Sequence, residues 1–391
     1  MRVLILCHDL IGPSMAGPAI RCWEFAKQLG KIHQVTLMGK VHGEVHPEGF
    51  TLVPYSKWGV WKAMGSHDVM ITQLLRPLLW LRKCISSIRV IIDAYDPMPL
   101  ENLEIFKDET PFSRIKKNAI ILAAFRRSFK KADGVICANE LQRDLWIGFL
   151  MGLKRITPSL YDQDPTLRAF IDIVPFGLSS APPVKSGPGF KSRYGLPSHA
   201  KVVLWGGGIW NWFDPLTAIR AIHLLQQKRS DIYLIFMGIK HPNPGVPAMR
   251  MAADAIAQAK ELDLFDKHVF FNTGWIPYHD RHNYLLEADI GISTHFLHLE
   301  TRYAFRTRML DYIWASLPIV ASEGDYFAKW IAEKRIGRAV PCENPVALAQ
   351  AIEDLIDRPD PGMKARLAEA AQTFTWEQVI KPLQEMIDAK R

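Results

Sequence analysis

Short apolar runs alternate along the chain with stretches of helical periodicity. In the first half, these runs predict buried strands at 2–7, 34–38, 69–72, 90–93, 134–138 and 171–174. Helical patterns lie between them, and in the stretch 18–29 the side chains of Ile20, Trp23, Phe25 and Leu29 fall roughly on one face. Strands separated by helices indicate βαβ units and a parallel sheet.

The alternation stops near residue 178 and then starts again. Residues 179–200 are rich in Pro, Gly and Ser and lack an apolar period, which indicates a linker. The second series of strands is predicted at 201–205, 232–237, 269–272, 289–293 and 318–321. Residues 376–390 have the pattern of one amphipathic helix. The sequence therefore predicts an α/β protein with two doubly wound domains, 1–178 and 201–375.

The composition is typical of a globular protein, and the cysteines indicate the cellular compartment. The chain has 391 residues, of which 48% are hydrophobic and 23% charged, so two domains are expected and disorder is not. Its five cysteines form no CxxC pair, which favours reduced thiols in a cytoplasmic protein. No carboxylate-rich cage surrounds His295 and His298, so we expect no metal. Neither a secretory signal nor a transmembrane stretch is expected.

Positive charge adds an expectation about partners. The net charge is +8, and the first 180 residues hold 23 Lys and Arg against 17 Asp and Glu. A basic face favours a phosphate, a membrane surface or a nucleic acid as partner. The stretch 112–132 interleaves basic with apolar residues, which is typical of a helix lying on an anionic membrane, or of a surface helix whose apolar face packs on the core. We expect no nucleic acid, because no recognition motif is present.

Ligands of parallel α/β sheets bind outside the carboxyl ends of the strands, so the loops there are candidate sites. The first loop, 8–18, carries Gly17 before a helix, which suits an anion but also suits an ordinary turn. Gly206, Gly207 and Gly208 follow the strand 201–205 and allow the backbone to approach a ligand closely. The neighbouring tryptophans stack on a ring or fill the core.

Two carboxylates follow the strand 90–93. Asp93 and Asp96 are suited to bind sugar hydroxyls or to act in acid–base chemistry. The alternative is that Asp96 and Pro97 form a turn and Asp93 is a cap.

The stretch 294–318 carries the densest group of candidates. A helix is predicted to open near Phe305, with Arg306 and Arg308 close to its start, which would neutralise a diphosphate. Glu300 precedes them, and Asp311 lies one turn in, where a carboxylate would accept hydrogen bonds from a ribose diol. The alternative is a solvated charged face.

The whole chain resembles glycosyltransferase family 4, a retaining group with the GT-B fold. Residues 17–21 (GPAIR) are similar to its N-terminal donor loop, and 270–293 (FFNTGWIPYHDRHNYLLEADIGIS) to its strand, turn, helix and "AD" strand. Residues 311–321 (DYIWASLPIVA) are similar to its E-A-M-A-x-G-x-P-V-V-A segment, and the helix at Trp376 to its closing helix. The nearest match is a subgroup that glycosylates surface polysaccharides and natural products.

The resemblance implies two Rossmann-like domains facing across a cleft, with the helix 376–391 returning to the first. It implies a nucleotide-sugar donor bound mainly by the second domain, a saccharide or lipid-linked acceptor, and no cofactor or metal. Transfer retains the anomeric configuration: the acceptor attacks from the face of the leaving phosphate, which takes its proton. The protein is then expected to be cytoplasmic, at the inner face of a membrane.

Residue matching gives the carboxylates their roles. Asp311 falls on the glutamate that binds the donor ribose in the family. The glutamate that faces the donor sugar falls on Tyr303, so we expect Glu300 to substitute for it.

The cations depart from the family pattern. The family's Arg and Lys on the donor phosphates fall on Gly208 and Phe213. We expect Arg306 and Arg308 to supply the missing charge, with Lys240 in reserve.

The first domain has fewer matching positions. The family's catalytic histidine falls in the loop that holds Asp93 and Asp96, so Asp96 is expected in its place. Gly17 would let the backbone approach the phosphates, and Arg21 and Asp93 would lie on the acceptor side. Two other functions stay open: a sugar-nucleotide epimerase or hydrolase of the same fold, and a non-catalytic partner subunit.

Overall fold

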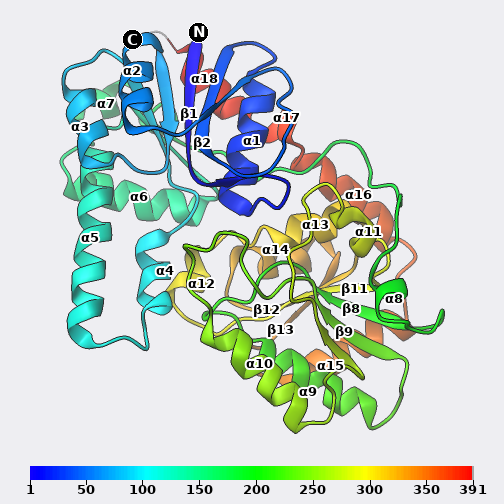
Figure 1. The fold of residues 1–391 in the computed structure, drawn as a ribbon. Coiled ribbons are helices and arrows are strands. Elements are labelled where there is room, and N and C mark those ends of the chain that lie inside the picture. Colours follow the sequence, from blue (N-terminus) through cyan, green and yellow to red (C-terminus); the bar gives the residue numbers. More distant parts are fainter. Residues whose placement is uncertain (390–391) are drawn as a thin grey trace. The chain divides into compact units, whose positions relative to one another are not determined.

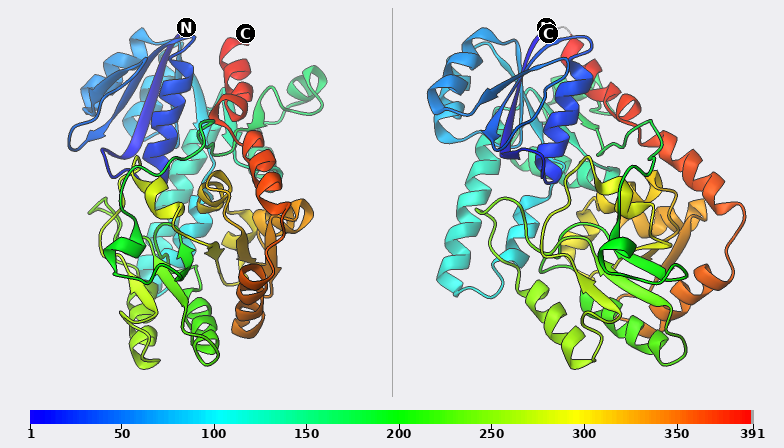
Figure 2. Two further views of the ribbon diagram at one scale, coloured as in Figure 1. Left: turned by 90° about the vertical axis from the view of Figure 1, so that its right-hand side faces the viewer. Right: turned by 45° about the vertical axis from the view of Figure 1, so that its right-hand side comes forward.

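The computed structural model describes residues 1–389. The chain divides into two compact units, which are described separately: unit 1 is Met1–Gly177 with Trp376–Arg391, and unit 2 is Leu178–Thr375. Each unit has a central parallel sheet with helices packed on its faces (Figures 1 and 2).

Unit 1 contains a seven-stranded sheet in the order β3-β2-β1-β4-β5-β6-β7. Its strands are β1 (Arg2–Ile11), β2 (Gln34–Val41), β3 (Thr51–Pro54), β4 (Val69–Thr72), β5 (Arg89–Asp93), β6 (Gly134–Cys137) and β7 (Ile171–Ile173). Its helices are α1 (Gly17–Leu29), α2 (Lys57–Ser66), α3 (Pro77–Cys84), α4 (Met98–Ile105), α5 (Pro111–Lys130), α6 (Glu140–Gly152), α7 (Pro158–Gln163), α17 (Trp376–Val379) and α18 (Lys381–Asp388).

The middle strands are apolar throughout because helices cover both faces of the sheet. All four residues of β4 are buried, and Val3 of β1 pairs with Val35 on one side and Val69 on the other. β1 is longer than the predicted strand: after a register shift it pairs Ile11 with Val41. His8 therefore belongs to the strand and not to the loop predicted for 8–18.

Unit 2 contains a six-stranded sheet in the order β10-β9-β8-β11-β12-β13. Its strands are β8 (Lys201–Trp205), β9 (Ile232–Phe236), β10 (Val269–Phe271), β11 (Ile290–Ser293), β12 (Ile319–Ser322) and β13 (Gly337–Val340). Its helices are α8 (Phe190–Arg193), α9 (Pro215–Gln226), α10 (Arg250–Glu261), α11 (Arg281–Leu285), α12 (Leu299–Tyr303), α13 (Arg308–Trp314), α14 (Tyr326–Lys334), α15 (Pro345–Asp357) and α16 (Met363–Thr373).

The helix predicted to open near Phe305 begins three residues later, as α13, and a separate short helix, α12, precedes it. Ala304 ends α12 in an extended conformation with φ −70° and ψ 153°, and α13 begins at Arg308. Glu300 therefore lies in α12, and Arg306 in the link that follows it.

The C-terminal stretch is also two helices and not one. Pro382 lies in the first turn of α18, where its missing N–H breaks no helical hydrogen bond. Lys390, the last residue of the predicted helix, lies outside the described residues. The side chain of Trp376 packs closely on Gly177, where an added Cβ would approach the indole to 2.5 Å.

The segment 179–200 lies within unit 2 and is anchored to α11 and its C-terminal end. Asn283 accepts hydrogen bonds from the amides of Ser186 and Gly187, both at 2.8 Å. Glu287 accepts another from the amide of Lys191 at 2.7 Å. The segment therefore lacks an apolar period because it is mostly irregular and is held by side chains that bind its backbone amides.

Candidate functional site

A buried ion pair lies between α12 and α13 in unit 2. The guanidinium of Arg306 donates two hydrogen bonds to the carboxylate of Glu300, at 2.8 and 2.7 Å. Their side chains are 5% and 1% exposed. Two of the predicted site residues thus contact each other directly, and each balances the charge of the other.

Arg308, at the start of α13, has a different environment. Its Nη2 donates to the carbonyl of Gly208 at 2.9 Å, and its guanidinium lies 4.7 Å from the ring centre of Trp205 and 4.2 Å from that of Phe213. Its Nη1 is buried and has no hydrogen-bond partner among the described residues. Burial, together with the charge of Arg306, lowers the pKa of Arg308 to about 10, so it stays protonated at neutral pH.

Both guanidiniums converge on Phe213. Arg306 lies 4.7 Å from its ring centre and Arg308 lies 4.2 Å from it. Guanidiniums stack favourably on aromatic faces, so this ring helps to hold two positive charges in one small volume.

A tyrosine of α13 fixes the position of the glycine loop. The hydroxyl of Tyr312 accepts a hydrogen bond from the amide of Gly206 at 2.6 Å and lies 3.0 and 2.9 Å from the carbonyls of Leu204 and Ile292. Gly207 has φ +83°, a conformation that favours glycine. The loop after β8 therefore has a fixed position relative to Arg308.

The tryptophans of this loop have different environments. Trp205 is fully buried and belongs to the core, and Trp212 is 4% exposed. Trp210 is half-buried and stacks on Trp212 with the ring centres 5.1 Å apart. Of the three, Trp210 is the one whose ring is open to a ligand.

A neutral histidine adjoins the two arginines. Burial and the charge of Arg306 lower the pKa of His295 to about 3. A neutral imidazole has one N–H, and its Nε2 lies 3.2 Å from the carbonyl of Glu323, so Nε2 donates there. Nδ1 is then an acceptor, and it is buried without a partner among the described residues. Nε of Arg306 is a donor that is likewise buried without a partner among the described residues.

Asp311 is more open to solvent than Glu300, Arg306 and Arg308. One of its oxygens accepts a hydrogen bond from Nε of Arg281 at 2.9 Å, and its side chain is 39% exposed. Arg281 in turn lies 3.9 Å from the ring centre of Tyr278 and 4.5 Å from that of Trp314. The sequence interpretation missed Arg281, whose signal was only its position at the start of the helix within the 270–293 motif.

Lys240 is not part of this cluster. It follows β9 and is exposed, and within residues 1–389 no contact joins it to Arg306 or Arg308.

Unit 1 holds a second buried ion pair, formed by Arg21 and Asp93. Arg21 is fully buried and donates to both carboxylate oxygens of Asp93 at 2.7 and 2.9 Å, and also to the carbonyls of Val174 and Pro175. The two residues predicted on the acceptor side therefore bind each other and tie α1 to the ends of β5 and β7.

Asp96, Tyr95 and Gly17 form a separate group in unit 1. Asp96 is half-buried and accepts a hydrogen bond from Gln73 at 3.4 Å. Burial, with the Asp96 carboxylate as the next cause, raises the pKa of Tyr95 well above its usual value. An added Cβ on Gly17 would lie 3.6 Å from the Tyr95 hydroxyl, so these residues are neighbours. Tyr95 was not among the predicted site residues.

Two wider observations bear on the choice of chemistry. Within residues 1–389, no three His, Cys, Asp or Glu side chains are grouped so that they could hold a metal. Among the same residues, no helix combines the length and the apolarity that crossing a bilayer requires.

Comparison with known proteins identifies the second unit. The family model described as "Glycosyl transferases group 1" matches residues 200–358. A search of curated protein sequences finds no match.

Solved structures resemble the chain over its full length. WaaG, a glycosyltransferase involved in lipopolysaccharide biosynthesis, has a TM-score of 0.69 at 15% identity, covering 99% of this chain and 100% of WaaG. HepE of Anabaena, in complex with UDP, has a TM-score of 0.67 at 15% identity, covering 99% of both chains. A glycosyltransferase of Rickettsia africae has a TM-score of 0.65 at 15% identity, covering 98% of this chain and 97% of that one. At such low identity, the structural likeness establishes only the fold, which is GT-B.

The family match covers residues 200–358 and the whole chain has the GT-B fold, so the protein is a glycosyltransferase whose second unit is similar to group 1.

Proposed function

We propose that this glycosyltransferase moves a sugar, with retention, from a nucleoside-diphosphate donor to a saccharide or lipid-linked acceptor in polysaccharide or glycoconjugate synthesis. Two structural relatives agree with the donor and the pathway: HepE has been solved with UDP-glucose, and WaaG acts in lipopolysaccharide biosynthesis. The subgroup acting on surface polysaccharides and natural products is part of this proposal.

One observation carries the proposal: Arg308 is a charged, buried guanidinium with no carboxylate partner among the described residues. An unbalanced buried charge is unfavourable unless an anion binds it. It lies against the glycine loop at the carboxyl end of β8, where parallel sheets bind ligands. A donor diphosphate is an anion of suitable charge for this position.

The position where the family has a lysine supports the same conclusion. Phe213 occupies the position where the family has a lysine, and its ring has two guanidiniums within 5 Å. We infer that Arg308 stabilises the departing diphosphate and that Arg306, shared with Glu300, contributes the second positive group. Lys240, exposed in the loop after β9, is a further donor-binding candidate.

The carboxylates have complementary roles in the proposal. Asp311, oriented by Arg281, accepts hydrogen bonds from the donor ribose. Glu300 positions the donor sugar, and its pairing with Arg306 fixes its rotamer. The backbone of Gly207 and Gly208 approaches the donor closely.

Unit 1 is the proposed acceptor side. Asp96 is its catalytic candidate, because its carboxylate is half-buried at the end of β5 and neighbours the hydroxyl of Tyr95. Gly17 is the proposed donor-binding residue of this unit, because it has no side chain to shield its backbone from a phosphate. Arg21 and Asp93 act through position, because each is occupied by the other.

We further propose that α5 brings the enzyme to the inner face of a membrane. Phe112, Ile115 and Ile120 are 79%, 70% and 61% exposed, and the helix also carries exposed Arg114 and Lys116. Exposed apolar and basic side chains on one helix favour an anionic lipid surface.

The proposal is tested by a thermal-shift screen of nucleoside diphosphates, followed by turnover assays. Binding to the native state raises the unfolding temperature, so the matching nucleotide is found without knowing the sugar. We expect sugar release only when an acceptor is present. Conversion of the donor alone would indicate an epimerase or hydrolase, and no shift with any nucleotide would indicate a non-catalytic partner subunit.

A further inference from the structure

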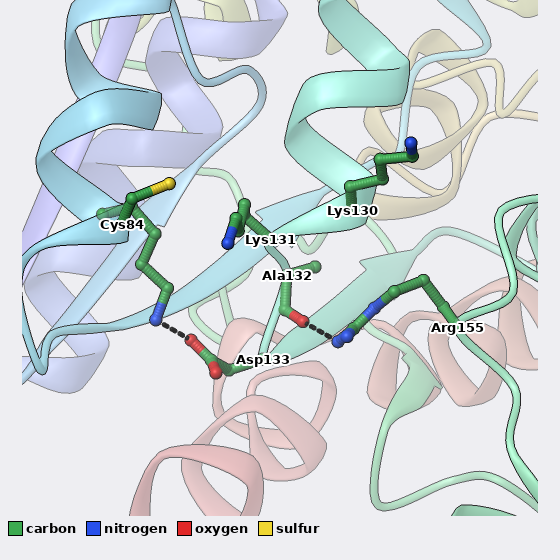
Figure 3. Close-up of a pocket in the computed structure, with 7 residues that line it drawn as sticks. Cys84, Lys130, Lys131, Ala132, Asp133 and Arg155 are labelled. Carbon is green, nitrogen blue, oxygen red and sulfur yellow. Dashed lines mark hydrogen bonds and ion pairs between the residues drawn. The ribbon is translucent and has the colours of Figure 1, made fainter.

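A hollow of about 240 Å³ lies in unit 1 and is lined by none of the candidate site residues. It is lined by Lys83, Cys84, Lys130, Lys131, Ala132, Asp133 and Arg155 (Figure 3). These residues belong to the ends of α3 and α5 and to the segment after α6. Because Asp133 immediately precedes β6, the hollow lies at the amino end of that strand, whereas Asp96 follows the carboxyl end of β5.

One lysine and the only acidic side chain of this hollow neutralise each other. The amine of Lys83 lies 2.6 Å from the carboxylate of Asp133 and donates to the carbonyl of Ile88 at 2.6 Å. The Lys83 side chain is only 9% exposed. This pair is therefore a fixed part of the wall and adds no net charge.

The other three basic side chains have no such balance. Nη2 of Arg155 donates to the carbonyl of Ala132 at 2.5 Å, while its Nε is buried without a partner among the described residues. The amine of Lys131 lies 6.0 Å from the ring centre of Trp80. Within residues 1–389, neither Lys130 nor Lys131 forms an ion pair.

Helix ends account for only part of this charge. α3 and α5 both end at the hollow, and each C-terminus carries about half a negative charge that attracts cations. Two such ends offset about one of the three unbalanced positive charges. A net positive charge remains in a concave site, which attracts anions.

We propose that this hollow binds a phosphate group. Figure 3 shows Lys131 and Arg155 on either side of Ala132, with Asp133, the ion-pair partner of Lys83, close by. The Arg155 guanidinium suits phosphate oxygens, and the Lys131 amine adds a second charge. The phosphate belongs either to a soluble phosphorylated metabolite or to an anionic lipid headgroup, since the hollow adjoins the end of α5.

Calorimetric titration of the full-length protein with inorganic phosphate tests the site directly. The ionic strength is held constant, because screening alone weakens any anion binding. We expect Lys131→Gln to weaken phosphate binding about tenfold and Lys131→Arg to retain it. Lys131→Gln removes no hydrogen bond described here, so its fold is expected to be intact. Lys364→Gln, an exposed change in unit 2, is the control.

A second arm distinguishes the two sources of phosphate. The protein is mixed with vesicles of phosphatidylcholine, with and without phosphatidylglycerol, and compared with Lys131→Gln and with Lys62→Gln, which removes the same charge from an exposed position of α2 outside both the hollow and α5. Loss of phosphatidylglycerol-dependent binding in Lys131→Gln alone supports a lipid headgroup. Phosphate binding without that loss supports a soluble ligand. If Lys131→Gln matches the wild type with both probes, the proposal is overturned.

Discussion

The buried ion pair of Glu300 and Arg306 gives the strongest prediction about how single residues stabilise unit 2. Removing one partner of a buried ion pair leaves the other charge uncompensated, which costs about 3–5 kcal/mol. We therefore expect Glu300→Ala to destabilise the protein by about that amount in urea unfolding. The double variant Glu300→Ala, Arg306→Ala should lose less than the two single changes together, because no lone charge remains. Additive single losses would contradict a coupled pair.

His8 supplies a residue-level prediction about pH. Burial, with the charge of Arg76, lowers the pKa of His8 to about 4, whereas an unfolded histidine titrates at about 6.5. Between these values the unfolded chain takes up a proton that the native state excludes, so stability falls as the pH drops from about 6.5 towards 4. Replacing His8 by Asn should remove this part of the acid-side loss.

The measurement is urea unfolding of both proteins at about pH 5 and about pH 7. Asp325 has the opposite effect on stability. Burial raises its pKa to about 6, so the native state binds a proton more readily than the unfolded chain and Asp325 stabilises the protein as the pH falls. The contribution of His8 is therefore read from the difference between the variant and the wild type. Equal pH dependence in the two proteins would show that His8 is not held neutral.

At the residue scale, the sequence identified chemistry but not partners. Glu300, Arg308 and Asp311 stood out because charged residues clustered after a predicted strand. That Arg306 binds Glu300 depends on the extended link at Ala304, and that Arg281 binds Asp311 depends on contact across 30 residues. Neither has a local sequence signal.

Among the elements, α13 organises the glycine loop through one hydroxyl. Tyr312→Phe would leave the amide of Gly206 without its acceptor, and a buried unpaired donor costs about 1–3 kcal/mol. We expect that loss in urea unfolding, together with weaker nucleotide binding, since Gly206 to Gly208 would no longer be fixed. Tyr284→Phe is the matched control, because no hydrogen bond of its hydroxyl is described. Equal stability of the two variants would contradict this role of α13.

The elements also show where apolar pattern is sufficient. The central strands were predicted because burial on both faces makes them apolar runs, as in β4 and β8. β3 was missed because it is a short edge strand whose residues are exposed or half-buried. β13 was missed because it is also an edge strand and begins at Gly337 with an exposed Arg338.

For the whole molecule, α5 predicts a membrane-dependent location. Replacing Phe112 and Ile115 by Ser removes two of the most exposed apolar side chains of the protein without touching its core. We expect this variant to sediment less with phosphatidylglycerol vesicles than the wild type does, with donor turnover in solution unchanged. Leu297→Ser, an equally exposed change in unit 2, is the control. Vesicle binding equal to wild type would exclude α5 as the membrane contact.

The fold of the whole molecule was accessible from the sequence, but the fold does not select a substrate. GT-B structures at 15% identity share two sheets, whereas the donor and acceptor are determined by individual side chains. Here the cations depart from the family pattern, so a direct measurement of diphosphate binding tests the proposed site most sharply.

Calorimetric titration with the nucleoside diphosphate selected by the thermal-shift screen provides that measurement. We predict that Arg308→Ala weakens its binding at least about tenfold, whereas Arg302→Ala, a change at an exposed arginine of α12, leaves it unaltered. Wild-type affinity in Arg308→Ala would contradict the claim that this buried guanidinium holds the leaving group.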